Sequence, residues 1–90
     1  MQSTPLQVGE RVQPIPFKHK NKLGEIKFIG EIEGKIAGTW IGIELDEPKG
    51  ENNGDFNGKI YFDCKPGHGI FLRPPQVKSL SSSQGDVSDV

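Results

Sequence analysis

The sequence has little of what large, secreted or membrane proteins contain. Hydrophobic residues make up only 32% of the 90 residues, so the chain can bury one thin core and is expected to form one small domain. Its single cysteine, Cys64, cannot build a disulfide framework and favours a reducing, intracellular compartment. The first residues have neither a basic start nor an apolar segment, so we expect no signal peptide. No stretch approaches the roughly 20 apolar residues that span a bilayer.

An excess of charge of one sign is also missing. The formal net charge is −1, from 11 basic and 12 acidic side chains. Proteins bind nucleic acid largely through clustered positive charge, which this chain lacks overall, so we expect no nucleic-acid partner. The local basic segment, with Lys18, Lys20 and Lys22, keeps a nucleic-acid-binding barrel open as an alternative. The same segment could instead be a solvated hairpin tip or an electrostatic contact for an acidic partner.

Glycine and proline are abundant, with 12 and 7 residues, which is typical of short strands joined by tight turns. Strands are predicted over 10–17, 24–30, 40–45, 60–62, 70–73 and 76–80. The segments between them are predicted to be loops or turns, namely 18–22, 31–38, 46–58 and 65–69. The polar ends, over 1–7 and 81–90, predict a flexible lead-in and a disordered tail. The fold class is therefore all-β, an open or barrel-like antiparallel structure.

The alternation of side chains predicts which faces of two strands are buried. One face of the strand 40–45 has three aliphatic side chains, those of Ile41, Ile43 and Leu45. The other face has Trp40, Gly42 and Glu44, and Gly42 leaves a gap there that a neighbouring group can fill. In the strand 10–17, Val12 and Ile15 are the expected core residues. Pro14 and Pro16 predict that this strand is bent or lies at an edge.

Groups suited to catalysis or metal binding are sparse. Cys64 and His68 are spaced as C-x3-H, but a structural zinc site needs four ligands and no second pair is present. As a nucleophile and base they lack a third group to orient the histidine. We therefore interpret Cys64 as a small core residue and His68 as a turn residue or a contact at the rim of a site. The glycine-rich segment 50–54 lacks the lysine and helix of a phosphate-binding loop. We expect no enzymatic activity, no cofactor and no metal.

The aromatic residues instead indicate a binding surface. Four of them lie close to glycine-rich segments in the sequence, namely Trp40, Phe56, Phe62 and Phe71. Glycines let a loop fold tightly and present its backbone amides outward. Aromatic walls beside amide donors suit a peptide end that has a carboxylate and an aromatic ring.

Six segments together resemble the CAP-Gly domain family. They read VGERV at 8–12, GEIKFIG at 24–30, GTWIGIELDEPKG at 38–50, GENNG at 50–54, GKIYFDC at 58–64 and GHGIFLR at 67–73. The third is similar to the family pattern G-x-W-x-G-V-E-L-D-E-P-x-G, and the fourth stands where the family usually has Gly-Lys-Asn-Asp-Gly. The resemblance covers 8–80 and implies a small SH3-like antiparallel open barrel of short strands with long glycine-rich loops.

Members of this family bind the acidic C-terminal tails of α-tubulin, end-binding proteins and CLIP-type linkers, which end in Glu-Glu-Tyr or Glu-Glu-Phe. The resemblance implies the same class of ligand here and a cytoplasmic place on the microtubule cytoskeleton, with no membrane or nucleic-acid partner. By position, it implies that Asn52 hydrogen-bonds the tail, Trp40 and Phe71 form an apolar groove, and Lys59 and Arg73 supply positive charge. It also implies three residues that shape the loop, namely Gly50, Asn53 and Gly54.

Two positions depart from the family pattern. Glu51 replaces the motif lysine, and Lys35 or Ile36 stands where the family usually has a groove phenylalanine. An exposed ion pair is worth about 0.2–1 kcal/mol, so replacing it by a repulsion costs on the order of tenfold in affinity. Lys35 could restore positive charge, and we count both Glu51 and Lys35 among the candidate peptide-binding residues. The alternative is a divergent CAP-Gly scaffold that binds a non-tubulin peptide, such as a proline-rich or basic segment of a signalling partner.

Overall fold

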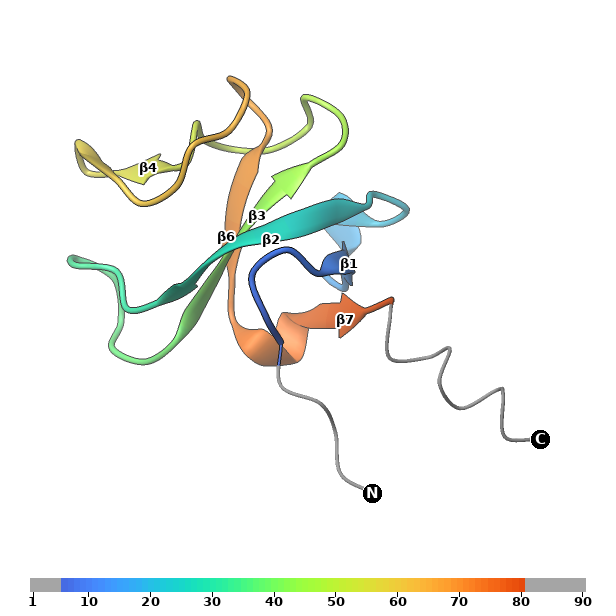
Figure 1. Cartoon of the computed structure of the whole chain (residues 1–90), viewed down its shortest axis with the longest axis horizontal. Helices are drawn as coiled ribbons and strands as arrows, with labels where there is room; N and C mark the ends of the chain where they lie inside the picture. Colours follow the sequence, from blue (N-terminus) through green and yellow to red (C-terminus); the bar gives the residue numbers. More distant parts are fainter. Residues whose placement is uncertain (1–5, 81–90) are drawn as a thin grey trace.

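The computed structural model describes residues 6–80, so the predicted tail and most of the predicted lead-in lie outside the described residues (Figure 1). The strands are β1 (Arg11–Pro14), β2 (Gly24–Gly30), β3 (Trp40–Leu45), β4 (Asp55–Phe56), β5 (Lys59–Ile60), β6 (Gly69–Leu72) and β7 (Val77–Ser79). Two single-turn 3-10 helices, η1 (Phe17–His19) and η2 (Pro74–Gln76), interrupt them. Neither described helix is long enough to cross a membrane.

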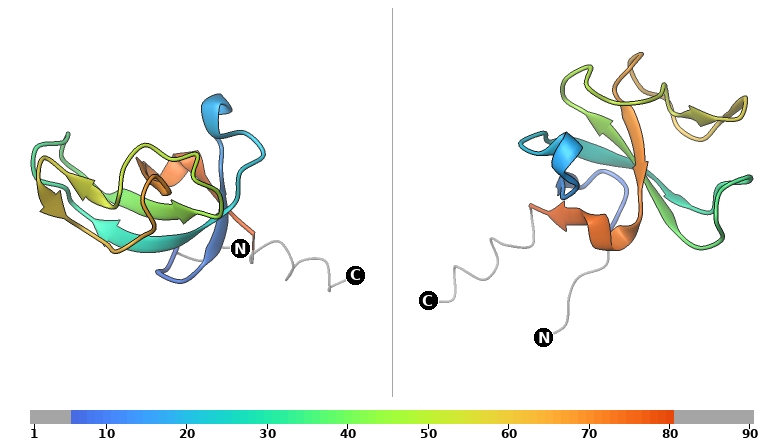
Figure 2. Two further views of the ribbon diagram at one scale, coloured as in Figure 1. Left: turned by 90° about the horizontal axis from the view of Figure 1, so that it is seen from above. Right: turned by 180° about the vertical axis from the view of Figure 1, so that it is seen from behind.

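Five strands form one antiparallel sheet in the order β6-β3-β2-β1-β7. The sheet is strongly twisted, and the β4–β5 hairpin lies across the molecule from β7 (Figures 1 and 2). The predicted all-β antiparallel class is therefore confirmed. The chain leaves the sheet at β3, forms the long excursion that contains the hairpin, and returns to pair β6 with β3.

One face of the sheet is an aliphatic core. Its buried members come from five strands and are Val12, Ile26, Ile41, Ile43, Leu45, Ile70, Leu72 and Val77. The predicted burial of alternate residues in 40–45 is confirmed. The prediction for Ile15 was wrong, because this side chain is 57% exposed. Residues two apart share a face of a strand, so Pro14 lies with Val12 toward the core and Ile15 points away.

A β-bulge in β2 redirects one aromatic side chain. The pairing with β3 steps from Ile26 opposite Ile43 to Phe28 opposite Gly42, so two residues of β2 match one of β3. Without the bulge, Phe28 would share the core face with Ile26. With it, Phe28 moves to the opposite face, and Ile29 returns to pack against the core.

The hairpin lies within and just after the segment 46–58, which the sequence predicted to be an irregular loop. Asp55 pairs with Ile60, and the two residues between the strands, Asn57 and Gly58, both have positive φ, 51° and 82°. Asn-Gly with two positive φ angles is the two-residue turn that best fits the twist of paired strands. The strand predicted at 60–62 therefore ends at Ile60, and Tyr61 and Phe62 follow it.

Candidate functional site

The second face of the sheet is aromatic, and Gly42 lies at its centre. A Cβ atom at Gly42 would lie 2.5 Å from Cε1 of Phe62, so the ring occupies the space that a side chain would need. Phe71 lies opposite Gly42 on the neighbouring strand β6. The gap predicted at Gly42 is thus filled by an aromatic ring from the excursion between β3 and β6.

Four rings on this face contact one another edge to face. The ring centroids are 5.3 Å apart for Phe28 and Tyr61, 6.0 Å for Tyr61 and Phe71, and 5.6 Å for Phe62 and Phe71. Such edge-on pairs add about 0.5–1.5 kcal/mol each to the effect of burial. We call these four rings, together with Trp40 on the same side of β3, the aromatic face. Of these five rings, Phe62 is buried and the other four are partly exposed.

Three cationic side chains lie on these rings. The guanidinium carbon of Arg73 is 4.1 Å from the ring centroid of Trp40, and Nζ of Lys59 is 5.3 Å from that of Tyr61. Nζ of Lys35 lies 4.7 Å from the Trp40 ring and 4.4 Å from that of Phe56. Lys35 therefore links the hairpin to the aromatic face. Cations over aromatic rings are attracted by about 0.5–1 kcal/mol each at exposed sites.

Arg73 also fixes the loop before β3. Its Nη1 atom donates to the carbonyl of Thr39 at 3.0 Å, and Nη2 donates to the carbonyls of Ile36 and Ala37 at 3.2 and 2.9 Å. The indole Nε1 of Trp40 donates to the same Ile36 carbonyl at 2.9 Å. Arg73 thus holds the position of Trp40 as well as placing positive charge beside it. The Ile36 side chain itself is 78% exposed.

A hollow of about 430 Å³ adjoins the aromatic face at Tyr61. The loop 31–38 and Lys59 form its walls. The Tyr61 hydroxyl accepts a hydrogen bond from the backbone N–H of Glu33 at 3.0 Å, which anchors this loop to the aromatic face. Lys59 lies 4.0 Å from the Glu33 carboxylate, and both side chains are largely exposed.

The glycine loop 50–54 does not present its backbone amides outward, so that part of the prediction was wrong. All five N–H groups donate within the protein. Gly50 bonds to the carbonyl of Gly67, Glu51 and Asn52 to that of Gly69, Asn53 to the Asp55 carboxylate and Gly54 to the Asn52 side chain. The backbone of this loop therefore offers no free N–H group to bind an anion, because all five donors are already used.

The two asparagines of this loop hold it in different ways. Oδ1 of Asn52 accepts the N–H of Gly54 at 2.8 Å, and Oδ1 of Asn53 accepts the N–H of Gly67 at 2.8 Å. Asn53 thus ties the loop to the turn before β6. Gly54, at a φ of 89°, uses its carbonyl to accept the N–H groups of Tyr61 and Phe62. The loop therefore positions two aromatic residues that follow the hairpin.

Glu51 points to η1. Its Oε2 atom lies 2.6 Å from Nζ of Lys18 and 3.4 Å from Nε2 of His19. The hydrogen bond from Lys18 lowers the pKa of the Glu51 carboxyl below its usual value. Glu51, which replaces the lysine of the family motif, is thus paired with a cation of the same chain. His19, predicted to be in a polar loop, is only 4% exposed.

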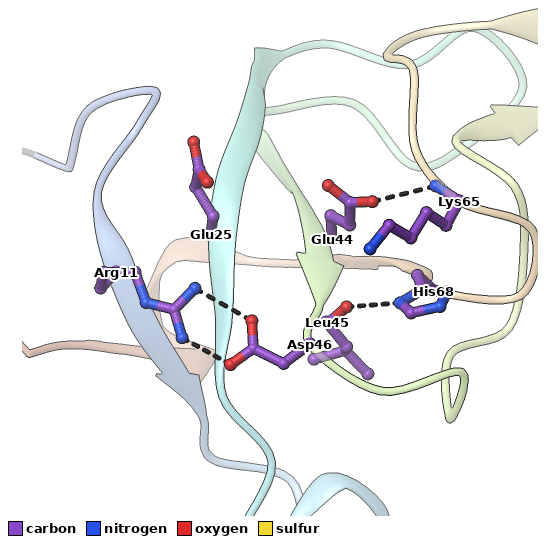
Figure 3. A pocket seen from close by; sticks show the side chains of 7 residues that line it. All are labelled: Arg11, Glu25, Glu44, Leu45, Asp46, Lys65 and His68. Carbon is purple, nitrogen blue, oxygen red and sulfur yellow. Dashed lines mark hydrogen bonds and ion pairs between the residues drawn. The ribbon is translucent and has the colours of Figure 1, made fainter.

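A separate polar cleft of about 160 Å³ lies at the far end of β3 (Figure 3). Arg11 and Asp46 form a two-pronged pair at 3.0 and 2.6 Å, which holds the pKa of the Asp46 carboxyl below its usual value. His68 is buried, with Nδ1 2.7 Å from the Leu45 carbonyl. Most of the groups lining this cleft are therefore already bonded, since the Glu44 carboxylate also accepts the backbone N–H of Lys65 at 2.9 Å.

Cys64 is partly buried and outside the aliphatic core, so its assignment to the core was wrong. Burial raises the pKa of its thiol, and Sγ donates to the carbonyl of Lys65. Within residues 6–80, no three His, Cys, Asp or Glu side chains are arranged to hold a metal ion.

Sequence reasoning missed three residues that shape the site. Phe28 was hidden by the bulge, although two adjacent apolar residues at 28 and 29 signal that both faces of β2 are covered. Tyr61 was included in a strand that ends before it. Lys18 was placed in a basic loop, interpreted either as a solvated hairpin tip or as a contact for an acidic partner, and only the folded chain brings it to Glu51.

Comparison with known proteins gives a consistent result. The family model described as CAP-Gly domain matches residues 8–77. The chain is 40% identical over 75 residues to tubulin-specific chaperone B of Dictyostelium discoideum, covering 80% of this chain and 27% of the chaperone. It is 39% identical over 80 residues to dynactin subunit 1 of Drosophila melanogaster, covering 89% of this chain and 6% of that protein. The chain therefore spans only a small part of these relatives.

Two solved structures are similar to most of this chain. The solution structure of the CAP-Gly domain of human kinesin-like protein KIF13B has a TM-score of 0.70 and 40% identity, covering 81% of this chain and 68% of that one. The Bik1 CAP-Gly domain with an ETF peptide from Bim1 has a TM-score of 0.64 and 33% identity, covering 77% and 78%. With the family model matched over most of its length, this chain belongs to the CAP-Gly domain family.

Proposed function

We propose that this CAP-Gly domain is an interaction module, not an enzyme, that binds acidic C-terminal peptides ending in an aromatic residue. Its partners would be the tails of tubulin, end-binding or CLIP-type proteins, which would link the protein that contains it to cytoplasmic microtubules. The observation that carries this proposal is the partly exposed aromatic face with Arg73, Lys35 and Lys59 lying on its rings. Rings and cations on one surface suit a ligand with an aromatic end and several carboxylates.

Different residues of the site would bind different parts of the peptide. The terminal ring of the peptide would pack against Trp40 and Phe71, which are partly exposed at the edge of the aromatic face. Because the amides of the glycine loop are already bonded, the peptide carboxylates would be bound by side-chain donors, chiefly the Asn52 amide, Lys35 and Lys59. Arg73 would add long-range attraction while it holds Trp40 in place.

The paired state of Glu51 supports an acidic ligand. A free carboxylate in this loop would repel the peptide, but Glu51 lies within ion-pair distance of Lys18 and beside His19. The loss of affinity that the sequence predicts from repulsion between Glu51 and an acidic peptide is therefore reduced. The peptide in the similar Bik1 structure is a further support, since that domain is 33% identical and was solved with an ETF peptide.

The single tryptophan of the chain offers a direct test, because Trp40 belongs to the candidate site. A peptide ending in Glu-Glu-Phe should change the tryptophan fluorescence in a saturable way. The same peptide ending in Glu-Glu-Ala, or with its C-terminal carboxylate amidated, should bind at least tenfold more weakly. Equal titration curves for the three peptides would contradict the proposal.

The divergent-scaffold alternative rests on the same Glu51. If the domain has changed its ligand, a proline-rich peptide should saturate the fluorescence change where the Glu-Glu-Phe peptide does not. The Lys18 contact makes this second candidate less favoured, because it removes the main electrostatic reason for a change of ligand.

A further inference from the structure

We infer that η1 and the turn after it form a second part of the peptide-binding surface, which binds the acidic residues that precede the aromatic end of the ligand. We call the segment 17–22 the basic turn. It has three lysines, Lys18, Lys20 and Lys22, and no carboxylate. The inference rests on the proposed function, because it concerns more of the same peptide.

Glu51 joins the basic turn to the candidate site. Its carboxylate is 2.6 Å from Nζ of Lys18, and the next residue in the chain is Asn52, in the glycine loop. The glycine loop bonds in turn to Gly69, at the start of the strand that contains Phe71. The basic turn is therefore continuous with the aromatic face through a short series of bonded residues, although it is remote from it in sequence.

The turn is held in a fixed conformation. His19 at its centre is 4% exposed, and its Nε2 atom faces Glu51 at 3.4 Å. Three backbone hydrogen bonds close the turn, from His19 to Pro16, from Lys20 to Phe17 and from Lys22 to His19. A buried anchor and a closed backbone place the lysines at defined positions, so less entropy is lost when they bind a ligand.

The charge of the turn is available to a partner. Three lysines against the one carboxylate of Glu51 leave a net positive charge, and the Lys18 side chain is still 68% exposed in its ion pair. Phe17 is 82% exposed, with Nζ of Lys20 5.6 Å from its ring. Charge complementarity and continuity with the candidate site favour an acidic peptide as the occupant. An extended nine-residue peptide spans up to about 30 Å, so its residues before the aromatic end can lie well away from the aromatic face.

The experiment compares two nine-residue peptides that share the end Glu-Glu-Tyr. One has glutamate at every preceding position, and the other has serine and glycine there. The full 90-residue chain should bind the glutamate peptide about three- to tenfold more tightly at low salt, and this gain should disappear near 0.5 M salt. In the Lys20→Ala/Lys22→Ala variant, which keeps the Lys18–Glu51 pair, the gain should fall below twofold.

The serine–glycine peptide separates binding from folding. Its affinity should be unchanged in the double variant, which shows that the aromatic face is intact. Lys78→Ala, an exposed lysine on β7, is the matched control and should keep the full gain. An equal gain in the wild type and the double variant would overturn the inference. Failure of both peptides to bind the wild type would instead reject the proposed function itself.

Binding of nucleic acid to the basic turn is the other outcome that would contradict the inference. If a duplex oligonucleotide bound the wild type, shifted the resonances of residues 17–22 and lost its affinity in the double variant, while the upstream glutamates gave no gain, the basic turn would be a nucleic-acid contact. We expect no saturable binding of the duplex, because the chain as a whole has a formal charge of −1.

Discussion

The two faces of the five-stranded sheet are built from different chemistry. The core face is aliphatic, and residues such as Ile43 and Ile26 are completely buried. The opposite face is made of aromatic rings that meet edge to face, and most of them remain partly exposed. Aliphatic packing without polar atoms stabilises the fold, whereas rings with exposed surface and neighbouring cations can bind a ligand. The fold therefore keeps its aliphatic core on one face of the sheet, and the proposed binding function belongs to the opposite, aromatic face.

The strongest test of this division is a cavity in the core face. Ile43→Ala removes a fully buried side chain and should lower the free energy of unfolding by about 2–5 kcal/mol, which is large for so small a domain. Urea denaturation followed by circular dichroism would measure it. Ile60→Ala, at a position 70% exposed, is the control and should change stability by less than about 0.5 kcal/mol. Similar losses for both variants would contradict the assigned core.

Gly42 lies in β3, whose neighbouring residues Ile41 and Ile43 are in the aliphatic core. On the aromatic face, the Phe62 ring occupies the space that a Gly42 side chain would need. Gly42→Ala would bring the new methyl group to within 2.5 Å of the Phe62 ring, so the ring must move. We expect a loss of about 1–3 kcal/mol in stability, together with weaker peptide binding, since Phe62 supports Phe71. Loss of stability with unchanged peptide affinity would show that the aromatic face does not depend on this packing.

Substitutions of Arg73 test whether the aromatic face needs a planar guanidinium group or only a positive charge. Arg73→Ala should weaken peptide binding about tenfold, because the Trp40 ring and the carbonyls of Ile36, Ala37 and Thr39 lose their common partner. Arg73→Lys keeps the charge but lacks the planar fork, so it should restore little of the affinity. Fluorescence titration of both variants measures the effect. Full recovery in the lysine variant would mean that charge alone matters.

The smallest expected effect concerns Glu51, whose folded-state pKa is lowered by Lys18. A lowered folded pKa means that the pair stabilises the protein above the ordinary glutamate pKa of 4.5, and that this contribution fades as the pH falls through the lower folded value. Glu51→Gln should therefore be less stable than the wild type by about 0.2–1 kcal/mol at pH 7. The difference should shrink toward pH 3 in thermal unfolding experiments.

Asp46→Asn provides a comparison at a carboxylate that is equally exposed and paired with Arg11. The Asp46 pKa is also lowered, so the pH dependence should have the same sign. A stability difference for Glu51→Gln that grows as the pH falls would contradict the pairing of Glu51 with Lys18.

The sequence was sufficient where local pattern decides the structure. Strict alternation over 40–45 predicted the buried face of β3, and the missing side chain of Gly42 predicted a close neighbour. The Asn57-Gly58 turn was equally local, and the hairpin it forms could have been predicted from that dipeptide. It was missed because the glycine-rich segment was treated as one loop.

The rest depended on contacts between distant segments. The bulge that turns Phe28 away from the core depends on how β2 pairs with β3, which a single strand does not encode. The pairing of the Glu51 carboxylate with Lys18 requires η1 to fold against the glycine loop. The amides of that loop looked available from composition, but all five donate within the protein, three of them to carbonyls of Gly67 and Gly69, far along the chain.

The most direct test of the central claim is an NMR titration of the 90-residue domain with a peptide that ends in Glu-Glu-Tyr. We predict saturable chemical-shift changes for the amides of 50–54, the Trp40 indole and Phe71. The resonances of the core residues of β3 should change little. If these resonances do not shift at millimolar peptide while the spectrum shows a folded domain, the aromatic face does not bind such tails, and the proposed function is wrong.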